Sequence, residues 1–164
     1  MSAIVSTPDL SDQFNQKVDI LEPIFKHYGG LKQGYGEITT VACFEDNSLV
    51  AEELKSPGKG RALVIDGKGS LRCSLLGDQL VAMAIDNAWG PILINGCLRD
   101  VELISSMPLV VMALGSIPRK TVKAGKGSLN SPISFAGVTF HPEHYLFADE
   151  TGILVAKSNL LTSL

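Results

Sequence analysis

Two acidic residues and one arginine, at a fixed spacing, are the part of this sequence best suited to chemistry. Asp78 follows Gly77 at the predicted start of a helix, and Arg99-Asp100 comes after twenty intervening residues, at a second predicted helix start. Free backbone amides at a helix N-terminus bind anions, and a guanidinium binds a carboxylate through paired hydrogen bonds. A carboxylate is also a good ligand for a hard metal ion. This pattern therefore predicts a site for a small anion together with a metal ion.

The two acidic residues also have a simpler explanation, because each stands where a helix is expected to begin. An acidic side chain at that position caps free amides and interacts favourably with the helix dipole. Two neighbouring residues favour the chemical role. Gly77 would let a ligand approach the amides that follow it, and Arg99 places an anion-binding group beside a metal-binding carboxylate. For Asp78, capping alone stays an open alternative, whereas Asp100 carries the metal-binding prediction.

The elements that must position these residues alternate between short apolar strands and helices. Helices are predicted over residues 7–15, 48–55, 78–88 and 99–105, and strands over 36–44, 61–66, 70–76, 91–94 and 109–113. Thr7 and Asn47 are the predicted N-terminal caps of the first two helices. Short apolar runs between glycines indicate buried strands, and alternation of strands with helices predicts parallel pairing.

The last third of the chain has a different pattern, with short strands predicted over 137–140, 145–148 and 152–155. The last two are joined by only three residues, Asp149 to Thr151, which predicts an antiparallel pair. Residues 18–32 contain Pro23 and a Gly-Gly pair, so we expect irregular chain with brief strands there. The sequence therefore predicts one mixed α/β domain over residues 1–164.

Composition argues against several function classes. The formal net charge is −3, the aromatic fraction is 6%, and no basic stripe occurs, so direct binding to nucleic acid is not expected. No apolar run approaches the roughly 20 residues that span a membrane. The first residues lack the basic and apolar regions of a secretory leader. The three cysteines lie far apart among apolar residues, as buried thiols do. We therefore expect a cytoplasmic protein.

Two other groups of residues contain side chains that could form a site. His141-Pro142-Glu143-His144 contains three potential metal ligands, but its proline and its spacing favour a turn before the next strand. Lys120, Lys123 and Lys126 form a small basic cluster with Arg119 in a segment rich in glycine and proline. Such a cluster is usually a solvated loop, and the border of an anion-binding cleft is the alternative.

The chain resembles the family of proteins similar to regulator of ribonuclease E activity A, which includes the class II 4-hydroxy-4-methyl-2-oxoglutarate aldolases. The resemblance covers nearly the whole chain, and the spacing of Asp78 from Arg99-Asp100 is the aldolase signature of the family. The other segments that carry it are residues 7–12, 43–47, 64–67, 95–98, 135–140 and 148–152.

This resemblance implies a swivelling β/β/α domain, similar to phosphohistidine domains, with mixed sheets and flanking helices. It also implies a homotrimer with the active site in a cleft between subunits. The substrate would be held by Gly77, Asp78, Gln79, Leu80 and Arg99. Asp100, with water, would hold a divalent metal cation, Mg²⁺ or Mn²⁺. Arg99 and Asp100 would be the catalytic pair.

The implied reaction is metal-dependent cleavage of 4-hydroxy-4-methyl-2-oxoglutarate to two pyruvates. Oxaloacetate decarboxylation passes through the same pyruvate enolate and is expected as a side activity. A Schiff-base mechanism would instead need a desolvated lysine of lowered pKa. The candidate lysines lie among glycines, basic residues or turns, where a lysine stays charged: Lys59, Lys68, Lys120, Lys123 and Lys126. The metal route is therefore better supported.

The alternative function is a protein-binding regulator that inhibits ribonuclease E without catalysis. Family members known as regulators can lack the acidic residue that follows the arginine. This chain retains it as Asp100, which favours the enzyme. The fold itself excludes neither function.

Overall fold

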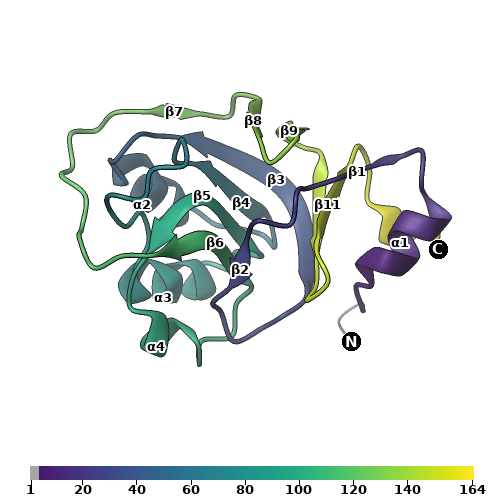
Figure 1. Cartoon of the computed structure of the whole chain (residues 1–164), viewed down its shortest axis with the longest axis horizontal. Coiled ribbons are helices and arrows are strands. Elements are labelled where there is room, and N and C mark those ends of the chain that lie inside the picture. The colour runs from purple at the N-terminus through teal and green to yellow at the C-terminus, as the bar shows by residue number, and fades with distance from the viewer. Residues whose placement is uncertain (1–3) are drawn as a thin grey trace.

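The computed structural model describes residues 4–164, and within them nine strands form one mixed sheet (Figure 1). Its central part is parallel, and its strands lie in the same order in space as in sequence. They are β3 (Gly34–Ala42), β4 (Ala62–Asp66), β5 (Ile92–Leu98) and β6 (Val111–Ser116). This confirms the parallel pairing predicted from the alternation of strands and helices.

Antiparallel strands extend the sheet at both sides. On one side, β10 (Tyr145–Ala148) pairs with β3 and with β11 (Ile153–Ala156), and β1 (Val18–Ile20) pairs with β11. On the other side, β2 (Lys26–His27) pairs with β6. The short β7 (Ser128–Leu129) pairs with the end of β3. A separate hairpin joins β8 (Ile133–Phe135) and β9 (Val138–Phe140).

Three helices cover one face of the sheet: α2 (Ser48–Leu54), α3 (Asp78–Asp86) and α4 (Val101–Ile104) (Figure 1). Each helix follows one parallel strand and leads to the next. The side chains of β4 show why both faces must be covered, because all five of its residues are buried. Leu63 and Ile65 pack against the helices, while Ala62 and Val64 pack on the opposite face, where the β8–β9 hairpin lies.

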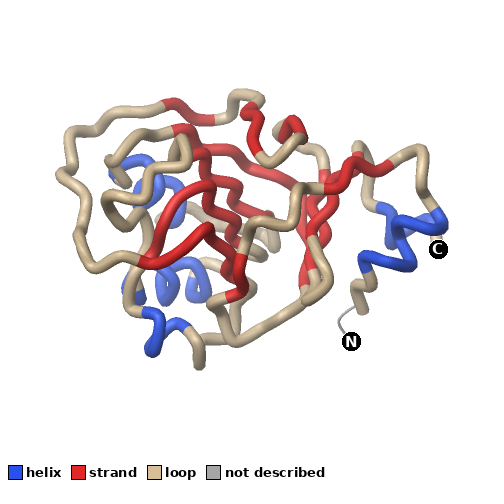
Figure 2. Tube along the Cα trace, viewed as in Figure 1, coloured by secondary structure: helices blue, strands red, loops and turns tan. Residues whose placement is uncertain are grey.

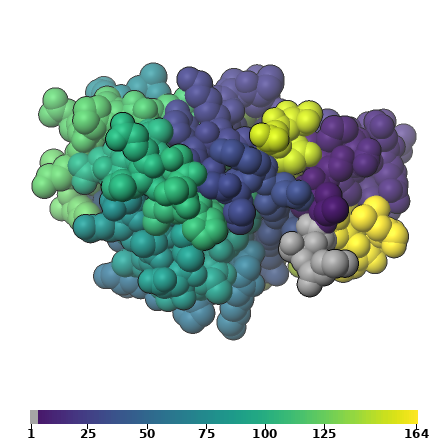
Figure 3. Space-filling view, turned by 90° about the horizontal axis from the view of Figure 1, so that it is seen from below, coloured from purple at the N-terminus to yellow at the C-terminus, as the bar shows by residue number. Residues whose placement is uncertain are grey.

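The two ends of the chain meet at the far edge of the molecule. Figure 2 shows α1 (Thr7–Gln13) set apart from the other helices, beside the short 3₁₀ helix Leu160–Ser163. Leu10 and Leu160 form a small core there with Phe147 and Leu154 of the sheet. The space-filling view likewise places the N-terminal and C-terminal segments together (Figure 3). None of the helices within residues 4–164 is long and apolar enough to cross a membrane.

The predicted fold class, mixed sheets with flanking helices, is confirmed, but three local predictions are wrong. Residues 70–76 are not a strand, since only Ser74 forms isolated bridges, to Cys97 and Lys120. The helix predicted over 99–105 begins at Val101. The cap of α1 is Ser6 and not Thr7, because the Ser6 hydroxyl accepts the hydrogen bond from the backbone amide of Asp9.

Candidate active site

The two predicted segments meet at the edge of the sheet where β4 and β5 end. The backbone amide of Asp78 donates a hydrogen bond to Oδ2 of Asp100 over 3.1 Å, and Nε of Arg99 lies 3.9 Å from the same oxygen. Parallel strands end at a common edge, and residues that follow them are brought together there. The spacing in the sequence is therefore the length of α3, a turn and β5, which together lead away from this edge and back to it.

Gly77 is required for this approach, because a Cβ atom at residue 77 would lie 2.7 Å from Oδ2 of Asp100. The carboxylate occupies the space that any side chain at this position would need. The extended backbone of Gly77, with φ of −131°, is open to other residues, so the reason for glycine here is space and not conformation. The predicted role of Gly77 was close approach by a ligand, and within the protein it permits close approach by Asp100.

Asp100 has a left-handed backbone, with φ of 60° and ψ of 40°, at the cap of α4. Asp adopts this conformation more readily than most residues, and such positions are frequent at functional sites. Its Oδ2 atom is held by the start of α3, while Oδ1 has no hydrogen-bond partner among the described residues. The side chain is 32% exposed. One carboxylate oxygen is thus fixed and the other is free to bind a ligand.

These features fit a metal ion that keeps most of its water. Mg²⁺ in proteins is commonly bound by one or two carboxylates, with water and substrate completing its coordination. No group of three or more His, Cys, Asp or Glu side chains in the described part of the chain could hold a metal ion. The free oxygen of Asp100 is the group in this cleft that could hold such an ion, as the family resemblance implies.

A cleft of about 710 Å³ contains all six residues predicted for the site. Its lining consists of Asn47, Ala51, Lys55, Ser74, Leu76, Gly77, Asp78, Gln79, Leu80, Met83, Arg99, Asp100, Lys120, Thr121 and Lys123. Its charged residues are three lysines and Arg99 against two carboxylates, which leaves two excess positive charges. In a chain of net charge −3, this local excess favours an anionic ligand.

The sequence pattern indicates only two of the three lysines that line the cleft. Lys120 and Lys123 belong to the basic cluster for which a solvated loop and a cleft border were both open, and they line the cleft. Lys126 of the same cluster does not. Lys55, at the end of α2, also lines the cleft, although nothing near it in the sequence indicates a site.

Asp46 fastens the segment that carries these lysines. Its Oδ2 atom accepts hydrogen bonds from the backbone amides of Ala124, at 2.9 Å, and Lys126, at 3.1 Å, while Oδ1 accepts from Ser48. Burial by itself would raise the pKa of Asp46, but the hydrogen bonds from Ser48, Lys126 and Ala124 outweigh it and hold the pKa well below its usual range. Asp46 is therefore a buried, charged anchor for residues 124–126.

Asn47 makes a second link to the same segment. Its side-chain amide donates to the carbonyl oxygen of Leu75, and its Oδ1 atom accepts from the hydroxyl of Thr121 at 2.8 Å. Asn47 holds the predicted N-cap position of α2, but its side chain forms no cap bond; the amide of Ser48 donates to Oδ1 of Asp46 instead.

The cysteines and the histidine turn behave as the sequence predicted. Burial raises the pKa of Cys43 to about 12, with smaller contributions from nearby carboxylates, and burial also raises the pKa of Cys73 and of Cys97. These thiols stay protonated at neutral pH, which makes them poor nucleophiles and poor metal ligands. Residues 141–144 form a turn, closed by a hydrogen bond from the amide of His144 to the carbonyl of His141.

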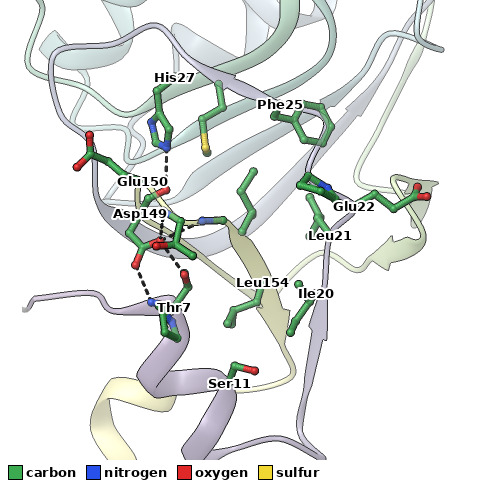
Figure 4. Close-up of a pocket in the computed structure, with 16 residues that line it drawn as sticks. Thr7, Ser11, Ile20, Leu21, Glu22, Phe25, His27, Asp149, Glu150 and Leu154 are labelled. Carbon is green, nitrogen blue, oxygen red and sulfur yellow. Dashed lines mark hydrogen bonds between the residues drawn. The ribbon is translucent and has the colours of Figure 1, made fainter.

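A second cavity, of about 390 Å³, lies between α1, β1 and the turn between β10 and β11 (Figure 4). Its walls are mostly apolar, with Leu21 and Leu154 facing it, and Glu22 and Glu150 point away from it. The carboxylate of Asp149 accepts hydrogen bonds from the amide and the hydroxyl of Thr7, at 2.7 and 2.6 Å. Asp149 therefore ties the start of α1 to the sheet.

The chain is similar to known proteins over nearly its whole length. The family model described as RraA-like (Aldolase/RraA) matches residues 7–155. A protein of Pseudomonas fluorescens (strain Pf0-1), named provisionally as a 4-hydroxy-4-methyl-2-oxoglutarate aldolase, is 51% identical over 154 residues, 94% of each chain.

Two solved structures share the fold closely. One, described as an S-adenosylmethionine:2-dimethylmenaquinone methyltransferase from Geobacillus kaustophilus HTA426, has a TM-score of 0.94 and 43% identity, and the match covers 96% of this chain and 98% of that one. The other, described as the RNA-processing inhibitor RraA from Thermus thermophilus, has a TM-score of 0.91 and 37% identity, with coverage of 96% and 94%. These names describe three different activities, so the fold alone does not select one.

Proposed function

The chain belongs to the RraA-like family, and from this membership we propose that it is a metal-dependent aldolase that cleaves 4-hydroxy-4-methyl-2-oxoglutarate to two pyruvates. The observation that carries the proposal is the hydrogen bond between Asp78 and Asp100, which brings all six predicted residues into one positively charged cleft. Similarity to relatives named as aldolases supports a carbon–carbon lyase.

Asp100 is the residue that would hold the divalent cation, Mg²⁺ or Mn²⁺, through its free oxygen. The cation, when bound, would polarise the keto group of the 2-oxo acid. The start of α3 presents the amides of Gln79 and Leu80 to the cleft, and we expect these amides to orient the substrate carboxylate. Asp78 lies in the first turn of α3, directly after the cap residue Gly77, and its amide is committed to Asp100.

Arg99 would stabilise the charge that forms during bond cleavage. The C4 hydroxyl gives its proton to solvent water, the C3–C4 bond breaks, and its electron pair forms the enolate of one pyruvate while C4 becomes the ketone of the other. Enolate protonation at C3 completes the reaction. The Arg99 side chain is 41% exposed and lies beside Asp100, so its guanidinium can reach the enolate oxygen.

Lys120 and Lys123 would select a substrate with a second carboxylate. The substrate is a dianion, and Arg99 with the α3 amides can satisfy only the end that reacts. The two lysines line the same cleft and are held there by the anchor at Asp46. We therefore expect them to bind the carboxylate at C5. Oxaloacetate has the same 2-oxo acid end, and loss of its distal carboxylate as CO₂ leaves the same enolate, so we propose its decarboxylation as a side activity.

The decisive experiment measures pyruvate release from 4-hydroxy-4-methyl-2-oxoglutarate and from oxaloacetate, with Mg²⁺ and with a chelator. We expect activity that the chelator removes and that Asp100→Asn abolishes. Asp86→Asn changes an exposed carboxylate at the other end of α3 and is the matched control, which should retain full activity. An inactive wild type, or an active Asp100→Asn variant, would refute the aldolase.

We also propose the homotrimer that the family resemblance implies. Three apolar side chains are exposed to solvent in the single chain: Phe44 at 52%, Leu71 at 60% and Val122 at 85%. Leu71 and Val122 line a neighbouring hollow that shares Lys120 and Thr121 with the cleft. Burial between subunits would remove this apolar surface from water. Size-exclusion chromatography with light scattering should give three times the mass of one chain, and Val122→Glu should weaken the assembly.

The second candidate function is inhibition of ribonuclease E, and its specific support is the likeness to the structure described as RraA. Binding would need a surface and no metal chemistry. Titration calorimetry with purified ribonuclease E tests it directly. Absence of heat at micromolar concentrations, with an active aldolase in parallel, would exclude this role.

A further inference from the structure

A hollow of about 870 Å³ lies at the opposite edge of the sheet from the catalytic cleft, where β4 and β5 begin. Its lining consists of Tyr35, Gly36, Glu37, Ser56, Pro57, Lys59, Gly60, Arg61, Gly90 and Tyr145. Three glycines form part of this lining. A Cβ at Gly36 or at Gly90 would each lie 2.5 Å from the carbonyl oxygen of Gly60, so the backbone there packs too tightly to carry side chains.

Arg61 is held rigidly at this hollow. Its Nε, Nη1 and Nη2 atoms donate to Gly58 O at 3.0 Å, Thr39 Oγ1 at 3.0 Å and Pro57 O at 2.8 Å. Its guanidinium also stacks over the ring of Trp89, 4.7 Å from the centroid. A guanidinium has five N–H bonds, so one on Nη1 and one on Nη2 are left without an acceptor among the described residues.

Arg61 is half-buried and has no carboxylate partner within residues 4–164, so its positive charge is not neutralised by an ion pair there. Lys59, two residues earlier, adds a second positive charge to the same hollow and has a left-handed backbone with φ of 54°. The acidic residue of the lining is Glu37, which forms no ion pair with either cation. The hollow therefore has an excess of one positive charge.

Two phenol groups complete the lining. The ring of Tyr35 stacks on Phe147 with centroids 5.9 Å apart, which fixes its orientation. Tyr145 lies opposite Glu37 on the neighbouring strand. Neither hydroxyl has a hydrogen-bond partner in the described part of the chain, so both are free to donate. Several unused donors and two cations thus surround one space.

We propose that this hollow is a binding site for the phosphate group of a small molecule, separate from the catalytic cleft. A fixed guanidinium suits an oxyanion because its N–H bonds are already oriented, so little entropy is lost on binding. A phosphate dianion has enough acceptor oxygens for Arg61, Lys59 and a phenol together. A single carboxylate would leave some of these donors unused.

The test is an NMR titration with phenyl phosphate, inorganic phosphate and acetate as probes. Binding is monitored through the amide resonances of Gly60 and Gly90 and the Nε–H resonance of Arg61. Phenyl phosphate should shift these signals with a dissociation constant of about 1 mM or tighter. Tighter binding of phenyl phosphate than of inorganic phosphate supports a phosphate ester as ligand. Equal binding of both supports a site for the free ion, and equal binding of acetate would overturn the phosphate proposal.

Two substitutions should act in opposite directions. Lys59→Gln should weaken binding by roughly fivefold, and Glu37→Gln should strengthen it by a similar factor, since each changes one partly exposed charge. Lys157→Gln alters an exposed lysine outside the hollow and should change nothing. The catalytic variant Asp100→Asn should bind like the wild type, which keeps this result independent of the aldolase. Equal affinity of all variants, or shifts confined to the cleft around Asp78, would overturn the proposal.

Discussion

The backbone amide of Asp78 and the carboxylate of Asp100 are joined by a hydrogen bond of 3.1 Å that fastens the start of α3 to the end of β5. This bond uses one oxygen of Asp100 and leaves the other without a hydrogen-bond partner among the described residues. It also explains Gly77, since a side chain there would displace the same carboxylate. The position of the proposed metal ligand is thus set by backbone of a neighbouring element and not by the rotamer of Asp100 alone.

Gly77→Ala should therefore damage the proposed aldolase without touching any charged group. The added Cβ would lie 2.7 Å from Oδ2 of Asp100, so the carboxylate must move. A misplacement of this kind can cost about 10²-fold in rate. Steady-state pyruvate release measures it. Gly152→Ala is the matched control, because a Cβ at that position meets nothing within 4 Å. Equal activity of both variants would contradict the geometric argument.

Arg99→Lys should lower kcat more than it raises KM. Lysine keeps the positive charge but loses the planar pair of donors that we expect to face the enolate. Loss of one donor to a developing oxyanion commonly costs 10²–10³-fold, so a fall of about 10²-fold is expected. Arg119→Lys alters an exposed arginine outside the cleft lining and should leave the rate unchanged. A change in KM alone would mean that Arg99 binds substrate without acting on the transition state.

Asp46→Asn should release the segment that carries Lys120 and Lys123. The free energy of unfolding should fall by about 1–3 kcal/mol, because the amides of Ser48, Ala124 and Lys126 lose a charged acceptor. Hydrogen exchange at the amides of Ala124 and Lys126 should accelerate, and KM for the dianionic substrate should rise. Unchanged protection of these two amides would show that Asp46 does not anchor the segment.

The pH dependence of this anchor has a definite sign. The folded protein holds the pKa of Asp46 below its usual range, so the unfolded chain binds the proton more readily. The stabilisation is therefore fully present above the unfolded pKa of about 3.9 and is lost as the pH falls below it toward the folded value. Urea unfolding at pH 7 and below pH 4 should show the difference between wild type and Asp46→Asn shrinking in acid.

Sequence patterns predicted the elements whose signals lie within a short stretch of the chain. The start of α3 at Asp78 and the antiparallel pair β10–β11 were readable because a helix period and a short connection are sequence-local signals. The strand predicted over residues 70–76 is wrong because the apolar pattern of this segment is typical of a strand. Their contacts are instead long-range: the amide of Ser74 donates to Arg119 O, and the amide of Leu75 donates to Cys97 O.

The cleft could be predicted only in part, because some of its residues are positioned by long-range contacts. The spacing of Asp78 and Asp100 reports two elements that return to one edge, so the pair was found. The place of Lys123 depends on hydrogen bonds from residues 124 and 126 to Asp46, more than seventy residues earlier. Nothing near Asp46 in the sequence shows that it is buried, at 3% exposure, or what it binds.

Thr7→Val tests whether Asp149 holds α1 against the sheet. Valine keeps the shape of threonine but removes the hydroxyl that donates to Asp149 over 2.6 Å. Burial would raise the pKa of Asp149, but hydrogen bonds from Thr7 and from the turn amides of Gly152 and Thr151 outweigh it and lower the pKa. The free energy of unfolding should fall by about 1–2 kcal/mol at pH 7. This loss should shrink below about pH 4, where the unfolded carboxylate takes up its proton.

Thr151→Val, at an exposed position, should cost less because only its backbone amide binds Asp149. Equal losses for the two variants at pH 7 would show that the hydroxyl of Thr7 contributes nothing specific to the attachment of α1.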